Sequence, residues 1–417
     1  MPPAPSLAID KPAVLVIFVL TYLGLAAGRV PGLKIDRTGI SILGAIALMI
    51  FGGLKTADVI GFVNWPTILL LFGFFVISAQ LRLSGFFDSV AKSVARRLDH
   101  PANFLLLLML ATAGLSAFLN HDIVCYAFAP IVGVALLRRR LNPVPFLIAL
   151  AIASNIGAAA TIVGNPQDMM IAQIAGLNFG RYALWCLVPV LVALASAYAI
   201  IWMMSRRQLA LEIEAPKESL SSISQPFNRP HTIKGLVILA VVIALFFSPI
   251  PKEIVALAAA GIHLASRKFH TADLLRIVDW PILVLFIGLF VVTGAFQTTG
   301  YGDHAVHWLA SHGLHLTSPT ILALSTAVLS NLINNAAAVL LLLKVANVAQ
   351  APAAYVLALA NSFGGSLVIS GSVSNIIVVE QARELGIPIS FRSFLRLGAP
   401  VTLVAMATML GWVMLMR

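Results

Sequence analysis

Charged residues are scarce in this chain of 417 residues. They make up 10% of the sequence, against about 25% in an ordinary soluble domain. Hydrophobic residues make up 60%. Apolar runs recur at lengths of about 17–25 residues, which is the length that spans a bilayer as a helix. This composition excludes a soluble globular protein and indicates an all-α polytopic membrane protein.

The sequence also lacks the signs of a cleavable leader and of an enzyme active site. Its opening, MPPAPSLAIDKP, has no basic segment, and no small-residue cleavage site follows the first apolar run, so we expect that run to remain as a span. Within the apolar segments, His121 with Asp122 is the only acid–base pair, and no nucleophile or complete metal site accompanies it. Cys125 and Cys186 fall in apolar segments, where packing is their usual role. We therefore expect neither enzyme chemistry nor a cofactor.

Basic residues are distributed unevenly along the chain, whose net charge is +11. Spans near 13–28, 38–53, 66–83, 146–175, 182–204, 233–248, 252–266, 281–296, 353–379 and 397–416 would leave six of them on one side: Lys11, Lys55, Arg181, Lys252, Lys344 and Arg417. The remaining basic residues would share the other side, which is then cytoplasmic. We expect about ten transmembrane helices in the cell membrane, both termini outside the cytoplasm, and no nucleic-acid partner.

Two further apolar segments fit this alternation only if each returns to the side from which it entered. Segment 102–137 has strongly basic flanks, KSVARR and RRR, so both flanks favour the cytoplasm. We expect a re-entrant hairpin with its tip at 118–122, and a second at 319–343 with its tip at 332–336. Irregular backbone at membrane depth is tolerated only where protein or a watery cavity covers it. The two tips therefore indicate a central site.

The two halves of the sequence are related by an internal repeat. The tripeptide NWP at Asn64 recurs as DWP at Asp279, an offset of 215 residues, and Asn120 maps onto Asn335 at the same offset. An odd number of crossings separates equivalent points, so the repeats must be inverted, as in many secondary transporters. We expect a first repeat at 1–210, a cytoplasmic linker at 211–232 and a second repeat at 233–417.

Helix-breaking residues interrupt the span 146–175. Gly157, Gly164 and Pro166 weaken or break an α-helix. The freed backbone groups would join the polar side chains of Ser154, Asn155, Thr161 and Asn165. Any one of these residues could simply bond to a neighbouring helix. However, a similar polar stretch recurs in the span 353–379, also after a polar tip, which favours a binding site divided between the halves.

Two acids, Asp122 and Asp168, are placed at membrane depth. Carboxylates are costly there and usually mark functional sites. Asp122, beside His121, is a candidate for proton or cation coupling. Asp168 has Asn375 as its repeat counterpart and is a candidate for coupling or for capping the resumed helix.

The segments SNIGAAATIVGNPQ, NHD and GGSLVISGSVSNIIVVEQA resemble the ion transporter superfamily, in particular its arsenite-permease and citrate-transporter-like branch. The resemblance covers nearly the whole chain. It implies a homodimer in which each protomer has a scaffold domain and a mobile transport domain, and elevator-type alternating access. The substrate contacts that it implies are the tips Asn120, His121, Asn334 and Asn335, the stretch Ser154 through Asn165 with Pro166, and the stretch with Asn361, Ser362, Gly364, Gly365, Ser366, Ser370, Gly371 and Ser372.

Departures from these relatives narrow the expected substrate. The tips read LNH and NNA, whereas the sodium/carboxylate relatives carry Ser-Asn-Thr at both tips. Asn165 stands where sodium/proton antiporter relatives carry an acid. We therefore expect efflux of arsenite or antimonite coupled to protons. The alternatives are uptake of a di- or tricarboxylate or another inorganic anion with sodium or proton symport and, ranked below it, sodium/proton antiport.

Overall fold

The computed structural model describes residues 10–28, 32, 34–98, 100–209, 226–265, 268–346, 348 and 350–416. These residues form twenty α-helices and one short 3₁₀-helix, and no β-strand occurs among them. Six helices of the described part are long and apolar enough to cross a bilayer: α4, α6, α7, α10, α14 and α20. The prediction of an all-helical membrane protein is confirmed.

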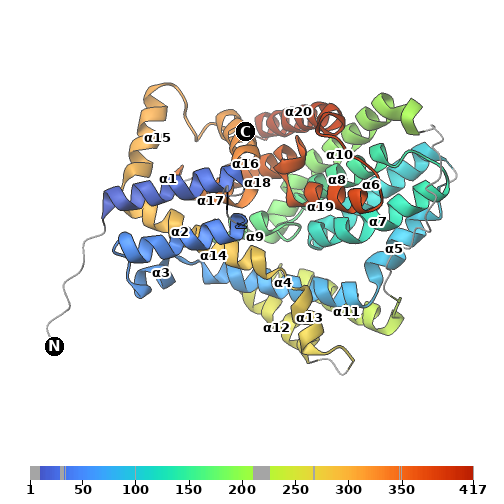
Figure 1. Cartoon of the computed structure of the whole chain (residues 1–417), viewed down its shortest axis with the longest axis horizontal. Coiled ribbons are helices and arrows are strands. Elements are labelled where there is room, and N and C mark those ends of the chain that lie inside the picture. Colours follow the sequence, from blue (N-terminus) through green and yellow to red (C-terminus); the bar gives the residue numbers. More distant parts are fainter. Residues whose placement is uncertain are drawn as a thin grey trace.

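The helices occur in the same order in the two halves of the chain (Figure 1). The first half contains α1 (Lys11–Ala27), α2 (Arg37–Phe51), α3 (Thr56–Phe62), α4 (Trp65–Leu83), α5 (Phe86–Ala95), α6 (Pro101–Phe118), α7 (His121–Arg138), α8 (Val144–Ala158), α9 (Pro166–Ile174) and α10 (Phe179–Leu209). The second half contains α11 (Arg229–Leu245), α12 (Lys252–Leu264), α13 (Thr271–Ile277), α14 (Trp280–Thr298), α15 (Tyr301–Ser311), α16 (Pro319–Leu332), α17 (Asn335–Val345), α18 (Ala353–Gly364), η1 (Ile369–Gly371), α19 (Val373–Glu384) and α20 (Phe391–Leu415).

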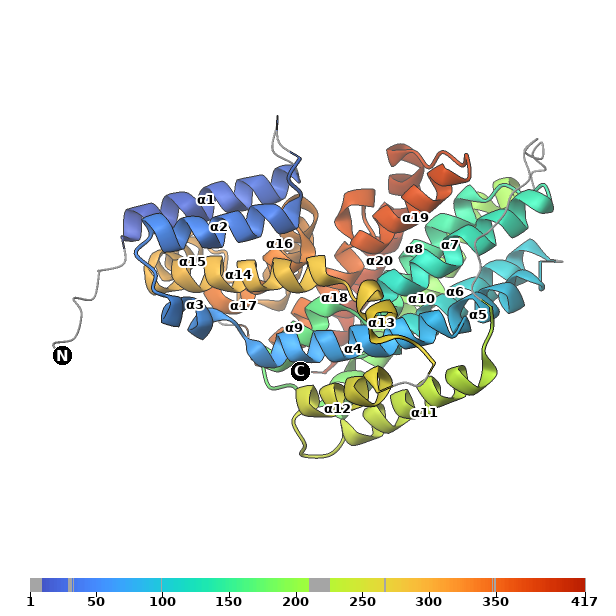
Figure 2. The same ribbon diagram turned by 60° about the horizontal axis from the view of Figure 1, so that its bottom comes forward.

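Packing between the halves also occurs in matched pairs. Helix α12 packs on α4, and its counterpart α2 packs on α14. Helix α7 packs on α19 as α17 packs on α9, and α10 packs on its own counterpart α20. Figures 1 and 2 show the α6–α7 hairpin toward one end of the long axis and α15 to α17 toward the other. Each half is therefore completed by elements of the other half.

The repeated NWP and DWP tripeptides begin the equivalent helices α4 and α14. The Oδ1 atoms of Asn64 and Asp279 accept hydrogen bonds from the backbone N–H groups three residues later, at 3.0 and 3.1 Å. The following proline lacks the N–H that a first helical turn leaves unpaired. The indole N–H groups of Trp65 and Trp280 donate to the carbonyls of Ile60 and Leu275 at 3.2 and 2.9 Å, which ties each helix to the short helix before it.

Each of the ten predicted spans overlaps a described helix or a broken pair of helices. Helix α11 begins at Arg229, because Asn228 caps it and Pro230 follows, and the boundaries of the two repeats stay a prediction. The rest of the predicted linker, 211–225, lies outside the described residues. Helices α6 and α7 are each long enough to cross a bilayer, so their re-entry stays a prediction.

Candidate functional site

Each hairpin turns at a polar tip where an asparagine caps the second helix. At the first tip, the Oδ1 atom of Asn120 accepts from the N–H of Asp122 at 2.9 Å. At the second, the Oδ1 atom of Asn334 accepts from the N–H of Ala336 at 2.7 Å. These equivalent caps pair Asn120 with Asn334, an offset of 214, rather than with Asn335. His121 then corresponds to Asn335, and the acid Asp122 corresponds to Ala336.

The first broken helix is unwound over 159–165, between α8 and α9. Glycine is required on both sides of this break, since a Cβ at Gly157 would overlap the backbone of Ala113, and one at Gly164 would overlap the carbonyl of Ala158. Thr161 donates to the carbonyl of Ala117 on α6. The unwound stretch is therefore held tightly against the first hairpin.

Asn165 caps α9 where the helix resumes, and its side chain also binds the carboxylate of Asp168. The Oδ1 atom of Asn165 accepts from the N–H of Asp168 at 2.7 Å, and its Nδ2 atom donates to Oδ2 of Asp168 at 2.7 Å. Asn375, the repeat counterpart of Asp168, instead donates to the carbonyls of Gly365 and Val368 in the second unwound stretch, at 2.7 and 2.9 Å. Asp168 and Asn375 thus stabilise equivalent breaks differently. The carboxylate of Asp168 accepts a hydrogen bond, whereas the amide of Asn375 donates two.

Hydrogen bonds also connect the two broken helices to each other. The Nδ2 atom of Asn165 donates to Ser362 on α18 at 3.2 Å. A second connection joins α8 to α19: Asn155 on α8 donates to Asn375 at 2.8 Å and accepts from Ser374 at 3.1 Å. These buried contacts hold the two unwound stretches together as one polar unit.

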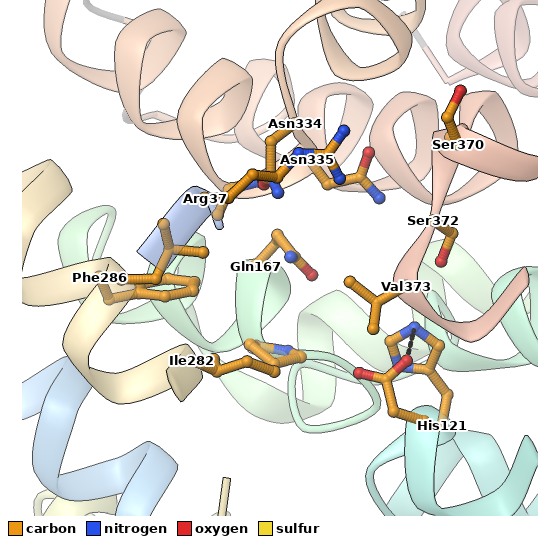
Figure 3. Close-up of a pocket in the computed structure, with 15 residues that line it drawn as sticks. Arg37, His121, Gln167, Ile282, Phe286, Asn334, Asn335, Ser370, Ser372 and Val373 are labelled. Carbon is orange, nitrogen blue, oxygen red and sulfur yellow. Dashed lines mark hydrogen bonds and ion pairs between the residues drawn. The ribbon is translucent and has the colours of Figure 1, made fainter. Parts of the chain in front are cut away.

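A cavity of about 40 Å³ lies between the tips and the resumed helices (Figure 3). In Figure 3, Arg37 lies beside Asn334 and Asn335 on one side, and Ser372 and His121 lie on the other. The cavity is lined by Arg37, His121, Asp122, Pro166, Gln167, Ile282, Leu285, Phe286, Asn334, Asn335, Ala336, Ser370, Gly371, Ser372 and Val373. Both tips and both broken helices therefore meet around one small space.

The predicted site residues divide into two groups around this cavity. The lining includes His121, Asp122, Pro166, Asn334, Asn335, Ser370, Gly371 and Ser372. The others are buried behind it: Asn120, Ser154, Asn155, Gly157, Thr161, Gly164, Asn165, Asp168, Asn361, Ser362, Gly364, Gly365 and Ser366. The second group shapes the unwound backbone.

Two polar lining residues were not singled out from the sequence. Gln167 is the last residue of the motif SNIGAAATIVGNPQ and directly follows Pro166, which starts α9. This position beside the break could have indicated that Gln167 lines the site. Arg37 opens α2, and its Nε atom donates to the carbonyl of Leu25 at 3.3 Å. Its equivalent at an offset of 215 is Lys252, also a cation at a helix start. The apolar wall from α14, residues 282–286, gave no signal, because its sequence is uniformly apolar.

His121 and Asp122 form the acid–base pair of the cavity. The Nε2 atom of His121 lies 3.5 Å from Oδ1 of Asp122, and both side chains are 8% exposed. The Nδ1 atom of His121 lies 3.2 Å from the carbonyl of Gly164, which can only accept, so Nδ1 carries a proton in this contact. One more proton, on Nε2 or on the carboxyl group, would join the pair.

Residues 14–360 match the family described as citrate transporter. The chain belongs to this family. An uncharacterized transporter of Mycobacterium tuberculosis strain H37Rv is 31% identical over 413 residues, covering 94% of this chain and 95% of the relative. The silicon efflux transporter LSI3 of rice, Oryza sativa subsp. japonica, is 26% identical over 448 residues, covering 91% and 92%.

The fold of this citrate transporter family member is also similar to a solved structure. The crystal structure of the Alcanivorax borkumensis YdaH transporter superposes with a TM-score of 0.58 over 97% of each chain, at 15% identity. The family and its relatives are transporters rather than enzymes. The resemblance to the ion transporter superfamily and the expectation of a non-enzyme are confirmed.

Proposed function

We propose that this transporter exports a small uncharged metalloid acid, arsenous acid or its antimony analogue, in exchange for protons. The observation that carries the proposal is the size and lining of the cavity between the two tips. The cavity is small, at about 40 Å³, and exceeds the minimum of about 10–15 Å³ that a single water molecule needs. Arsenous acid, with three hydroxyl groups on one central atom, is a small substrate of the kind that such a cavity suits.

The lining chemistry also favours a neutral hydroxylated substrate. Amide groups of Gln167, Asn334 and Asn335 and hydroxyl groups of Ser370 and Ser372 both donate and accept hydrogen bonds. Asn335 presents a buried Oδ1 atom that has no hydrogen-bond partner in the described part of the chain. Hydroxyl groups of a substrate can pair with such acceptors.

Proton coupling is assigned to His121 and Asp122. The pair lines the cavity and occurs in the first half only, because Asn335 and Ala336 hold the equivalent positions. Asp168, the other acid at depth, accepts a hydrogen bond at Oδ2 from the side chain of Asn165, the residue that caps α9. A substrate in the cavity would lie directly beside a proton bound to His121 and Asp122. Binding of one would therefore disfavour binding of the other, as exchange of substrate for protons requires.

The two-fold arrangement of the helices supports transport by alternating access. The cross-connected broken helices and their hairpins would move together as a transport domain, against a scaffold with α1, α2, α4, α11, α12 and α14. We further propose that two protomers form a homodimer through the scaffold and that the motion is elevator-like.

Uptake of a carboxylate, with sodium or proton symport, is the second candidate. The guanidinium group of Arg37 in the lining favours it, since this group pairs well with carboxylates. A tricarboxylate is several times larger than arsenous acid and carries several charges. Arg37 is the one permanent cation in the described lining, and the negative charge of an ionised Asp122 would offset it. The lining therefore has little net positive charge to bind a tricarboxylate.

The test is transport into everted membrane vesicles with an acidic interior. Arsenite should accumulate in vesicles that contain the protein, and collapse of the pH gradient should abolish the accumulation. Citrate, succinate and sodium should neither accumulate nor compete. Germanic acid, as an analogue of silicic acid, tests whether the substrate is the one named for the rice relative. Proton-driven loss of preloaded citrate from the same vesicles, without arsenite accumulation, would overturn the proposal in favour of the second candidate.

A further inference from the structure

A second concave site lies at the base of the first hairpin, away from the polar cavity. It has a volume of about 490 Å³ and lies between α5 and the C-terminal end of α7. Four cations line it: Lys92 of α5, Arg138 of α7, and Arg96 and Arg139, which directly follow the two helices. The rest of the lining is apolar, with Ala95, Leu98, Ile131, Val134 and Ala135. Cations therefore surround an apolar floor.

We propose that this pocket binds the phosphate headgroup of an anionic phospholipid, whose acyl chains lie along the apolar floor. Basic pockets between helices at the cytoplasmic surface of a membrane are suited to such headgroups. Guanidinium groups bind phosphate oxygens in a bidentate manner, and Arg96, Arg138 and Arg139 supply three of them.

The position of the pocket in the chain places it at headgroup level. Helix α7 is apolar almost throughout and then ends in the run Arg138, Arg139 and Arg140. Basic residues at the end of an apolar helix lie at the membrane surface. Helix α5 buries an apolar face that includes Phe87, as an interfacial amphipathic helix does.

Charge in the pocket remains positive after the nearby acid is counted. Asp88 lies one turn before Lys92 on α5 and is buried. Lys92, Arg138 and Arg139 also interact with other residues of the chain. With four cations in the lining and one acid beside it, the pocket is matched to an anion.

The repeat shows that the fold itself does not require these cations. Helix α15 is the counterpart of α5, and it also packs on the second helix of a hairpin. At an offset of 215 residues, His307 and Ser311 stand where the first half has Lys92 and Arg96. The same packing is made without permanent cations, so helix packing alone does not account for the four cations of the basic pocket.

A bound lipid would act on transport through α7. The base of this helix carries the basic pocket, and its other end carries His121 and Asp122 at the polar cavity. A headgroup held at the base would fix the hairpin relative to the membrane surface. Anionic lipid should therefore stabilise the protein, whatever its substrate.

The experiment uses the full-length protein purified in detergent and titrated with phosphatidylglycerol or phosphatidylcholine. Phosphatidylglycerol should raise the melting temperature of the wild type, and phosphatidylcholine should not. In Arg96→Gln/Arg139→Gln, phosphatidylglycerol should bind about thirtyfold more weakly, as expected for two cations. The matched control is Arg206→Gln/Arg207→Gln, which removes two cations from the end of α10 and should bind like the wild type.

A second variant tests the apolar floor without changing charge. Ala135→Trp should fill the pocket and weaken phosphatidylglycerol binding, even if the arginine variant folds poorly. Equal phosphatidylglycerol binding by Ala135→Trp, Arg96→Gln/Arg139→Gln and the wild type would overturn the proposal. Displacement of phosphatidylglycerol by inorganic phosphate at similar concentration would also overturn it, because the site would then bind a free anion.

Discussion

At the scale of single residues, asparagine has two different roles at the hairpin tips. Asn120 and Asn334 cap α7 and α17 through their Oδ1 atoms. The next residue in the second tip, Asn335, keeps a buried Oδ1 atom without a hydrogen-bond partner in the described chain and lines the cavity. Neighbouring residues of one type thus differ: Asn334 caps the helix, and we propose that Asn335 binds the substrate.

Alanine substitutions should separate these roles. Asn335→Ala should abolish transport and leave the melting temperature unchanged, because it removes a contact to the substrate only. Asn120→Ala and Asn334→Ala should each also lower the free energy of unfolding by about 1 kcal/mol, the usual value of a helix cap. Substrate uptake by proteoliposomes and thermal unfolding in detergent measure the two effects. Substantial transport by Asn335→Ala would favour a packing role.

At the scale of helices, the broken span of the first half depends on close backbone packing. Gly157 on α8 touches the backbone of Ala113 on α6, so that no Cβ fits between them. Gly114, the next residue on α6, has open space around it. Glycine is therefore required at Gly157 and replaceable at Gly114.

These two glycines provide a matched pair of variants. Gly157→Ala should destabilise the protein by about 1–3 kcal/mol, the usual cost of overpacking, and should push α6 away from α8. Gly114→Ala should be neutral or slightly stabilising, since alanine favours a helix. Thermal unfolding followed by size-exclusion chromatography checks both. Equal stability of the two variants would mean that the α6–α8 contact is looser than described.

The α6–α7 hairpin predicts a specific pattern of accessibility. Both of its ends should face the cytoplasm, so cysteines at Ser93 and Asn142 should not react with an impermeant thiol reagent added to intact cells. A cysteine at Ser311, in the second half, should react. The native Cys125 and Cys186 are buried and should give little background. Labelling at only one of Ser93 and Asn142 would show that the segment crosses the membrane.

At the scale of the whole molecule, the sequence repeat predicts the matched order of the apolar spans and the two unwound stretches, but not the short helices α3 and α13. Alternating basic flanks and the glycine–proline breaks carry that information locally. The role of Arg37 could not be predicted, because the residue enters the cavity from a distant helix start. The shift from Asn335 to Asn334 as the partner of Asn120 also required the structure, since only the cap hydrogen bonds show which asparagine ends the turn.

We propose that His121 and Asp122 couple protons to substrate movement through the cavity. The most direct measurement is arsenite accumulation in proteoliposomes under an imposed pH gradient, compared between the wild type and Asp122→Asn. The asparagine cannot take up or release a proton, so Asp122→Asn should lose pH-driven accumulation and keep downhill exchange. Equal pH-driven accumulation by the two proteins would contradict the account and make Asp168 the next acid to examine.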